Sequence, residues 1–485
     1  MDSQIFIRHS QSLTGKEMNE QITIAVVGSG YVGLVAAVCF AEIGHRVICV
    51  DNDESKIAML REGKIPIFEE YLPELLNRHR NTLIEFTSDL DAATRKSQAI
   101  FVAVGTPQSQ TGSADLSYVD AVASQIARSI TEYKVIVEKS TVPVYTNEWI
   151  RRVIERNGVP LELFDVASNP EFLREGTAVV DFLHADRIVI GVDTHRAGEL
   201  LRSIYKPLMS GRYYQSVDAV PGIRSAAEPP PLLQTSIKAA ELIKHASNAF
   251  LAMKISFINA VSNICEAAGA DVEQVSQGIG SDGRIGPQFL RAGIGYGGSC
   301  FPKDVAAFRY VAEQLGVEFG LLREVEEINR EQKRRFFEKV RFALWTFRGK
   351  KLGVLGLAFK GGTDDIRESP AVDLIGQFLK EGCVVSVYDP AAMERTKHAL
   401  PPSETLSYAE DAYEAASNAD ALLILTDWQE FSELDLNRLH NTLRYPIVID
   451  GRNLFDPTEM VQQGFTYVSV GRPVGTRLRD VAMSH

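Results

Sequence analysis

The sequence predicts an α/β protein built from two domains of doubly wound parallel sheet, joined by a long central helix. Short apolar runs alternate with amphipathic stretches in both halves of the chain, which is the βαβ rhythm of parallel sheets covered by helices. The length of 485 residues also exceeds what one hydrophobic core usually organises. We therefore expect two Rossmann-like domains that flank a helical middle.

The first series of strands begins at residue 22. The predicted strands are the runs ITIAVVG at 22–28, RVICVD at 46–51, AIFVAVGTP at 99–107 and KVIVEKSTV at 134–142. A second series begins near Lys350 with KKLGVLGLAFK and returns as CVVSVYDP, ADALLILTDW and PIVIDGRNLF, with a helix predicted from Ser369 to Lys380. Each series contains a strand, a turn, a helix and a strand that ends in Asp, which indicates architectural repetition.

The middle of the chain predicts one very long helix. From about Thr235 to Gly269, alanines and aliphatic residues recur at helical spacing without proline, which predicts a helix of roughly 30 residues. The Pro-rich segment before it favours an exposed irregular loop. The expected divisions are an N-terminal extension (1–20), a dinucleotide-binding domain (21–220), a Pro-rich loop (221–234), a central helical domain (235–345), a second α/β domain (346–470) and a C-terminal tail (471–485).

Composition excludes several classes of protein. No segment approaches the roughly 20 apolar residues that span a bilayer, and the N-terminus lacks a signal-peptide pattern, so we expect a cytoplasmic protein and no membrane partner. Five scattered cysteines without a CxxC pair fit neither a disulfide framework nor a zinc site. The net charge of -12 repels phosphates, which argues against nucleic acid as a partner.

A dinucleotide site is predicted at the first strand. Gly28, Gly30 and Gly33 form a GxGxxG pattern between a strand and a helix, and Asp51 ends the next strand. The glycines allow a tight turn, approach of the backbone to a pyrophosphate and close helix packing. Asp51 can accept hydrogen bonds from ribose hydroxyls and would repel a 2′-phosphate, which favours NAD over NADP, although Lys56 weakens this preference slightly. The alternative is a glycine turn that only connects strand and helix.

The corresponding turn of the second domain, GVLGLAFKGG, lacks the full fingerprint. We predict no second NAD site there. Lys360 and helix N-termini could instead hold a diphosphate, and the alternative is a purely structural domain.

A reactive thiol is predicted at Cys300. It follows a glycine run and precedes Lys303 and Asp304, and a nearby cation lowers the pKa of a thiol. Thiolates form thiohemiacetals with aldehydes, which opens a route from aldehyde to acid. The remaining cysteines, Cys39, Cys49, Cys265 and Cys383, are expected to be buried and inert.

Two further groups of polar residues are candidates. Glu171 and Glu175 would share one face if their segment is helical, and one of them could be a base; the alternative is a solvated helix face. Lys244 and Asn248 lie at i,i+4 in the long helix and could stabilise an oxyanion. The alternative is that they only form a structural hydrogen bond between domains. No HExxH or GxxxxGK[ST] pattern is present, so we predict no metal site.

These motifs, taken in order, resemble the nucleotide-sugar dehydrogenase family. The residues that carry the resemblance are GSGYVG, VGTP, EKSTVP, NPEFLREG, AAELIKHASNAFLAMKISFINA, GYGGSCFPKD, LGLAFKGGTDDIRES and IDGRNLF, and the match runs from about residue 22 to 470. The resemblance implies an N-terminal NAD domain, a central helical dimerisation domain and a C-terminal UDP-sugar domain. It also implies a homodimer or higher homo-oligomer and the four-electron oxidation of UDP-glucose to UDP-glucuronate by two NAD and one water.

The resemblance also implies roles for individual residues. Lys244 would assist alcohol oxidation, with Asn248 and Asp304 organising the water and proton network. Cys300 would hold the aldehyde as a thiohemiacetal and then as a thioester, which Glu171 would help water to hydrolyse, with Thr141 as a hydrogen-bonding partner. The positions implied for NAD are Gly28, Gly30, Val32, Gly33, Asp51, Lys56, Thr106, Thr141, Glu175, Lys303 and Arg367. Those implied for the UDP-sugar are Glu171, Phe172, Leu173, Arg174, Glu175, Lys244, Asn248, Arg284, Phe289, Leu290, Arg291, Ala292, Gly293, Gly297, Lys360 and Arg452.

Two alternatives stay open. A GDP-mannose dehydrogenase would use the same chemistry, and its cysteine turn, GGSCLPKD, differs from the turn found here mainly at Phe301. A catalytically silent NAD-binding protein is a different class, but it would have no physical need for Cys300, Lys244 and Glu171 together. An aldehyde-only dehydrogenase would also use a cysteine but could not oxidise the alcohol.

Overall fold

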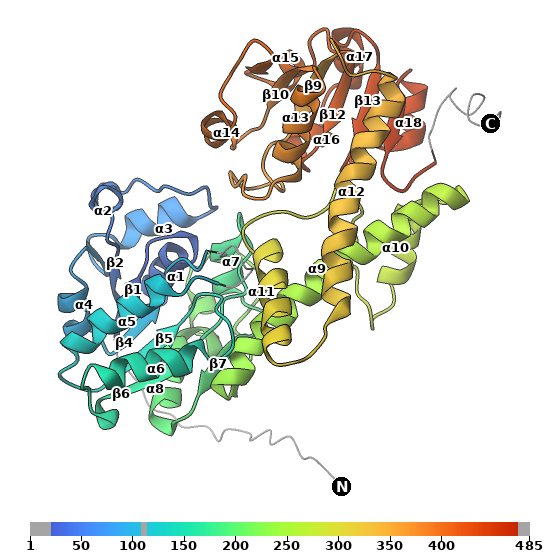
Figure 1. Cartoon of the computed structure of the whole chain (residues 1–485). Coiled ribbons are helices and arrows are strands. Elements are labelled where there is room, and N and C mark those ends of the chain that lie inside the picture. Colours follow the sequence, from blue (N-terminus) through green and yellow to red (C-terminus); the bar gives the residue numbers. More distant parts are fainter. Residues whose placement is uncertain (1–20, 108–113, 474–485) are drawn as a thin grey trace.

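The computed structural model describes residues 21–107 and 114–473. Two α/β bodies are connected by long helices, of which α12 runs between the body formed by the N-terminal half and the body formed by the C-terminal half (Figure 1). The predicted N-terminal extension, 1–20, and most of the predicted tail lie outside the described residues.

The N-terminal body contains a sheet of eight strands in the order β3-β2-β1-β4-β5-β6-β7-β8. All neighbouring strands are parallel except β6 and β7. The strands are β1 (Thr23–Val27), β2 (Arg46–Val50), β3 (Ile84–Thr87), β4 (Ala99–Val102), β5 (Lys134–Glu138), β6 (Phe164–Ser168), β7 (Ile188–Val192) and β8 (Leu232–Thr235). Strands β4, β5 and β6 are buried along their whole length, because helices cover both faces of the sheet.

The helices of this body follow the strands that they cover. They are α1 (Tyr31–Glu42), α2 (Glu54–Arg61), α3 (Leu72–His79), α4 (Leu90–Lys96), α5 (Ser117–Ser129), α6 (Thr146–Arg156), α7 (Ala178–Leu183) and α8 (His195–Met209). Nine residues of α1 are buried, so this helix lies in the main core against the sheet rather than on the surface.

The C-terminal body contains a six-stranded, fully parallel sheet in the order β11-β10-β9-β12-β13-β14. Its strands are β9 (Lys351–Leu355), β10 (Val384–Tyr388), β11 (Leu406–Tyr408), β12 (Ala421–Ile424), β13 (Ile447–Asp450) and β14 (Thr466–Ser469), and its helices are α13 (Pro370–Lys380), α14 (Met393–Ala399), α15 (Ala412–Ala416), α16 (Gln429–Ser432), α17 (Leu436–Thr442) and α18 (Pro457–Gln462). The first six strands of both sheets have the same order, so the prediction of two Rossmann-like domains is confirmed.

The long helix of the middle is also confirmed. Helix α9 (Ile237–Ala268) has 32 residues, begins at the N-cap Ser236 and ends at Gly269 in the left-handed conformation. It contacts β7 of the first body and the helices α10 (Val272–Gly280), α11 (Phe301–Gln314) and α12 (Gly320–Leu344). Because α9 is long, both the N-terminal body and the helix that follows the cysteine turn contact it.

Two local predictions need correction. The Pro-rich loop prediction was wrong for residues 232–234, because β8 pairs in parallel with β7 and uses the hydrogen-bonding edge that β7 would otherwise expose. The segment 169–176 contains no helix, so Glu171 and Glu175 do not share a helix face. Within the described part of the chain, no helix combines the length and the apolar character needed to cross a membrane.

Candidate active site

The glycine turn after β1 has the geometry that the sequence predicts. Gly28 has a φ of +98°, and a Cβ there would lie 2.6 Å from the carbonyl oxygen of Ala103. A Cβ on Gly33 would lie 1.8 Å from the carbonyl oxygen of Gly28, so α1 can approach the turn only with glycine. No atom lies within 4 Å of the Cβ position of Gly30. Helix α1 begins here without a side-chain cap, which leaves its N-terminus available to a pyrophosphate.

Asp51 lies one residue beyond β2 and beside the glycine turn. Its Oδ2 accepts hydrogen bonds from the backbone amide of Ser29 at 2.8 Å and from its hydroxyl at 2.6 Å, and Lys56 Nζ lies 3.3 Å away. Burial raises the pKa of Asp51, but the hydrogen bonds and Lys56 outweigh burial and hold the pKa below its usual value. The carboxylate is therefore ionised and placed to accept ribose hydroxyls.

A second contact joins the cysteine turn to the dinucleotide body. Lys303 Nζ donates to Thr106 Oγ1 at 3.1 Å, and the hydroxyl of Thr106 donates to the carbonyl oxygen of Thr141 at 3.0 Å. Thr141 is thus placed beside Thr106, while no contact between Thr141 and Glu171 occurs among the described hydrogen bonds. Val32 lies in the first turn of α1 and is partly exposed.

The residues predicted to carry chemistry meet between the bodies. Lys244 Nζ, from α9, lies 2.9 Å from Glu171 Oε1, and the amide of Asn248, one turn later, donates to Asp304 Oδ2 at 2.6 Å. Cys300 is the N-cap of α11, and Asp304 lies in the first turn of that helix. Segments far apart in the chain therefore converge on one thiol.

The charges of Lys244 and Glu171 stabilise each other. Burial would raise the pKa of Glu171, but Lys244 brings it below its usual value, with a contribution from the backbone amide of Leu173. Burial would lower the pKa of Lys244, but Glu171, Asp304 and Cys300 raise it. The pair is an ammonium and a carboxylate with little exposure to water.

The predicted lowering of the thiol pKa was wrong. Burial, followed by the negative charge of Glu171, raises the pKa of Cys300 to about 11, and Lys244 only partly opposes this. The prediction relied on Lys303, which is close to Cys300 in sequence, but the ammonium of Lys303 donates to Thr106 instead. The thiol is therefore protonated at neutral pH, so its proton must be transferred when the sulfur attacks.

Glu175 points away from Glu171 and toward the cysteine turn. It accepts a hydrogen bond from Ser299 Oγ at 2.9 Å, and Arg367 Nη2 lies 3.3 Å from it. Burial and the neighbouring Asp365 raise the pKa of Glu175 to about 8. Arg367 also pairs with Asp365 at 2.6 Å, so this cluster connects the two bodies at the cysteine turn.

A cavity of about 1130 Å³ opens over this centre. Its lining comes from the first body, α9, the cysteine turn and the second body. Of the predicted substrate positions, those that line it are Glu171, Phe172, Leu173, Arg174, Glu175, Lys244, Asn248, Phe289, Gly297 and Lys360. Burial lowers the pKa of Lys360, the cation that the C-terminal body contributes to this lining.

The remaining predicted substrate positions do not line the cavity. Leu290 and Ala292 are buried in the core of the C-terminal body, and the amide of Gly293 donates to Asn259 Oδ1 at 2.9 Å. Arg452 is half-buried and donates to the carbonyl oxygens of Leu425 and Phe359.

Two arginines point to solvent. The side chain of Arg284 is 90% exposed and pairs with Asp282. The side chain of Arg291 is 66% exposed and lies 3.6 Å from Asp427. Within one copy of the chain, neither arginine lines the cavity.

Lys139 and Asn169, to which the sequence patterns assigned no role, line the same cavity. Lys139 directly follows β5 and Asn169 directly follows β6. A charged residue and an amide at the carboxyl ends of two fully buried parallel strands were the signal that could have identified them.

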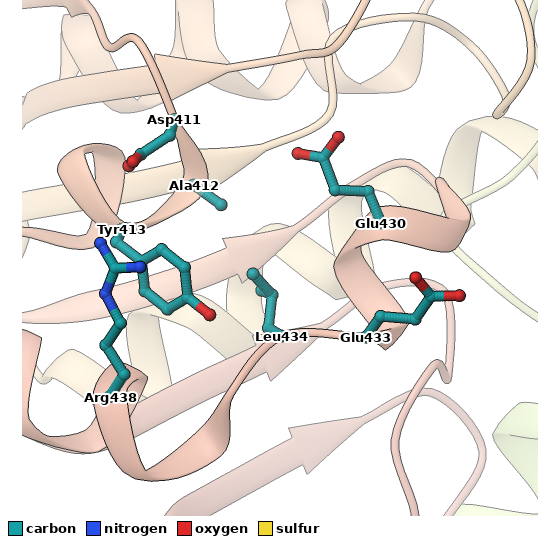
Figure 2. A pocket seen from close by; sticks show the side chains of 7 residues that line it. All are labelled: Asp411, Ala412, Tyr413, Glu430, Glu433, Leu434 and Arg438. Atoms are coloured by element: carbon teal, nitrogen blue, oxygen red, sulfur yellow. The ribbon is translucent and has the colours of Figure 1, made fainter.

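A smaller hollow of about 500 Å³ lies on the C-terminal body and is separate from this centre (Figure 2). Figure 2 shows Glu430 and Glu433 on one side and the ring of Tyr413 beside Arg438 on the other. None of the predicted site residues lines it. Across the described residues, no group of three or more His, Cys, Asp and Glu side chains could hold a metal ion.

Three family models match the chain consecutively. They are the NAD binding domain (residues 22–209), the central domain (238–331) and the UDP binding domain (353–457) of the UDP-glucose/GDP-mannose dehydrogenase family. The chain belongs to this family. It is an NAD-dependent dehydrogenase, and the open glycine turn and ionised Asp51 fit that cofactor.

Individual members of the family match over nearly the whole chain. The UDP-glucose 6-dehydrogenase TuaD of Bacillus subtilis is 44% identical over 94% of this chain and 95% of its own. The UDP-glucose 6-dehydrogenase of Rhizobium meliloti is 45% identical over 93% of this chain and 99% of its own. The structure of a UDP-glucose dehydrogenase from Pyrobaculum islandicum superposes with a TM-score of 0.84, 37% identity and coverage of 95% of this chain and 100% of its own.

Proposed function

We propose that this dehydrogenase oxidises UDP-glucose to UDP-glucuronate with two NAD and one water, and that Cys300 carries the intermediates. The observation that carries the proposal is that Cys300, Lys244, Glu171 and Asn248 line one cavity between the two α/β bodies, with Asp304 hydrogen-bonded to Asn248 behind it. The relatives named UDP-glucose 6-dehydrogenase, which are 39–45% identical, support the choice of sugar.

The chain's own residues account for the protons of the first oxidation. NAD, when bound, accepts the hydride of each oxidation. Lys244, held by Glu171 at 2.9 Å, provides a positive charge that stabilises the alkoxide as the primary alcohol loses its proton. Asn248 and Asp304, joined at 2.6 Å, hold the water through which that proton leaves. The product of this step is an aldehyde.

The second oxidation uses the thiol. The sulfur of Cys300 bonds to the aldehyde carbon, the thiol proton goes to the carbonyl oxygen, and a thiohemiacetal results. Loss of a hydride from carbon and of the hydroxyl proton converts it to a thioester. Glu171 then accepts a proton from the attacking water, and cleavage of the C–S bond releases the carboxylate and the thiol.

The nucleotide would be held by groups of the second body and of the cysteine turn. Lys360 lines the cavity, and Arg452 donates hydrogen bonds to the carbonyl oxygens of Gly295 and Phe359. These cations offset the net charge of -12 at the place where a diphosphate would bind. Arg284 and Arg291 point outward in one copy, so they could reach a sugar nucleotide only from a partner subunit.

The working unit in this proposal is a homodimer built on α9. Leu242, Phe250, Phe257 and Ile264 recur at intervals of seven or eight residues and are exposed, which leaves one apolar side of the helix open. The proposed divisions of the chain are 21–220, 235–345 and 346–470. In the segment 221–234, which connects the first two, residues 232–234 belong to β8 of the first sheet. Because all five cysteines are free, we place the protein in a reducing, cytoplasmic compartment.

The test is NADH formation by purified protein with UDP-glucose, GDP-mannose and UDP-N-acetylglucosamine in parallel, with NADH counted per sugar consumed. About two NADH per UDP-glucose are expected, since alcohol to acid takes two hydride transfers. Turnover of GDP-mannose alone would keep the mechanism and change the substrate. Absence of turnover with every sugar would leave a silent NAD-binding protein.

A further inference from the structure

Lys139 is a buried lysine that the proposed chemistry does not use. It is 3% exposed, and its Nζ donates to Asn169 Oδ1 at 3.1 Å. It forms no ion pair with any carboxylate of the described residues. An ammonium without an ion pair is costly to bury, and a parallel strand end does not need one. Burying Lys139 therefore costs free energy that the fold itself does not require.

The surroundings of Lys139 point to Glu171. Asn169, which accepts its hydrogen bond, is two residues before Glu171 and is also held by the hydroxyl of Tyr205 at 2.6 Å. Lys139 and Glu171 line the same cavity. The carboxylate thus has Lys244 at 2.9 Å and a second cation on the side of the first body.

We propose that Lys139 is a positioning residue that, together with Lys244, keeps Glu171 ionised and oriented for thioester hydrolysis. This inference rests on the proposed function and adds a residue to its hydrolytic step. In the proposed function Lys244 also stabilises the alkoxide of the substrate, so it does not serve Glu171 alone. Lys139 provides a second cation that the proposed oxidation steps do not use.

The electrostatics of the site agree in sign. Burial lowers the pKa of Lys139 to about 8, with Glu171 opposing this, so the lysine is mostly charged at neutral pH. Lys139 in turn helps to keep the pKa of Glu171 below its usual value. The other titratable groups that face the two residues are Cys39 of α1, Tyr205 of α8, Lys244 of α9, and Cys300 and Asp304 of α11.

The decisive experiment compares the pH profile of kcat for UDP-glucose oxidation in the wild-type protein and in Lys139→Met. Loss of the cation raises the pKa of Glu171, so the acid limb of the kcat profile should move to higher pH. The expected shift is about one pH unit for the removal of one charge from a protein interior. Lys139→Arg, which keeps the charge, should leave the limb near its wild-type position. An unchanged acid limb in Lys139→Met would overturn the proposal.

A matched variant separates positioning from folding. Lys134→Met removes a buried lysine at the opposite end of β5 and should not move the limb. If Lys139→Met does not fold, Lys139→Gln retains a hydrogen-bond donor and should show the same shift. If wild-type protein does not oxidise UDP-glucose, the proposed function fails instead.

A stability measurement tests the buried charge without turnover. The pKa of Lys139 lies near 8 in the folded protein, below its ordinary 10.5. The unfolded chain therefore binds more protons between these values, and wild-type stability should rise relative to Lys139→Met as the pH increases from 8 to 10.5. A difference that does not depend on pH would show that burial does not lower the pKa of Lys139.

Discussion

The two parallel-sheet bodies begin with the same local structure and diverge within three residues. In the first, the amide of Gly28 donates to the carbonyl of Val50 and that of Ser29 donates to Asp51. In the second, the amides of Gly356 and Leu357 make the equivalent bonds to Tyr388 and Asp389. Both glycines have a positive φ, +98° and +95°.

Beyond this shared turn, the backbone follows a different path in each body. Gly30 leaves open space and α1 begins at Tyr31, whereas Ala358 donates its amide to Asp389 and no helix begins before Pro370. Asp389 is 1% exposed and also accepts from Ala391, Ala392 and Trp428. A strand, a glycine and an aspartate are therefore not sufficient for a dinucleotide site. A helix start and an available carboxylate are also required.

The largest expected effect tests whether the two bodies serve one reaction. Cys300 lies between them, so Cys300→Ser should lower overall turnover on the order of 10³-fold or more, because the nucleophile is lost. Binding of NAD and of UDP-glucose, measured by calorimetry, should remain within about threefold of wild type, since neither turn is altered. Near-normal turnover would remove the thioester mechanism.

Asp389→Ala should act on folding. It leaves buried amides of Leu357, Ala358, Ala391 and Ala392 without their acceptor, which should cost about 3 kcal/mol or more of unfolding free energy in denaturant titration. The NAD dissociation constant should not change. A variant as stable as the wild type would show that Asp389 does not stabilise the fold. The proposed contrast between a structural aspartate in the second body and a cofactor-binding aspartate in the first would then be wrong.

Asp51→Ala is the matched change in the first body and should act on the cofactor. Loss of a charged acceptor should weaken NAD about ten- to hundredfold in equilibrium titration, and UDP-sugar binding far less. Equal weakening of both ligands would contradict the role of Asp51 at the ribose.

The smallest effect is expected for Gly30→Ala, which copies Ala358 of the second body into the first. Since no atom lies within 4 Å of the new Cβ, thermal stability should change little. NAD should bind about tenfold more weakly, because the Cβ occupies space that the pyrophosphate needs. Unchanged NAD affinity would indicate that the helix start, rather than the open space, distinguishes the two bodies.

Several elements were predictable from sequence because their signals are local. The strand–glycine–helix order around Gly28 and the alanine-rich run that became α9 depend on neighbours within a few turns. The strand β8 was missed, because only the exposed edge of β7 induces an extended conformation at Leu232–Thr235. The prediction that Glu171 and Glu175 share a helix face was also wrong, because contacts to α9 and to the cysteine turn hold the segment in a non-helical conformation.

By itself, the sequence determined the two βαβ series, the long helix, the cofactor turn and the residue types that the chemistry needs. These features arise from side-chain periodicity and from backbone freedom at glycine, which act over short distances. The tertiary structure alone decided which of the two aspartates stays available, that Lys303 points to Thr106, and that burial and Glu171 raise the pKa of Cys300 to about 11. Desolvation and charge at a buried site depend on groups that the chain brings together only when it folds.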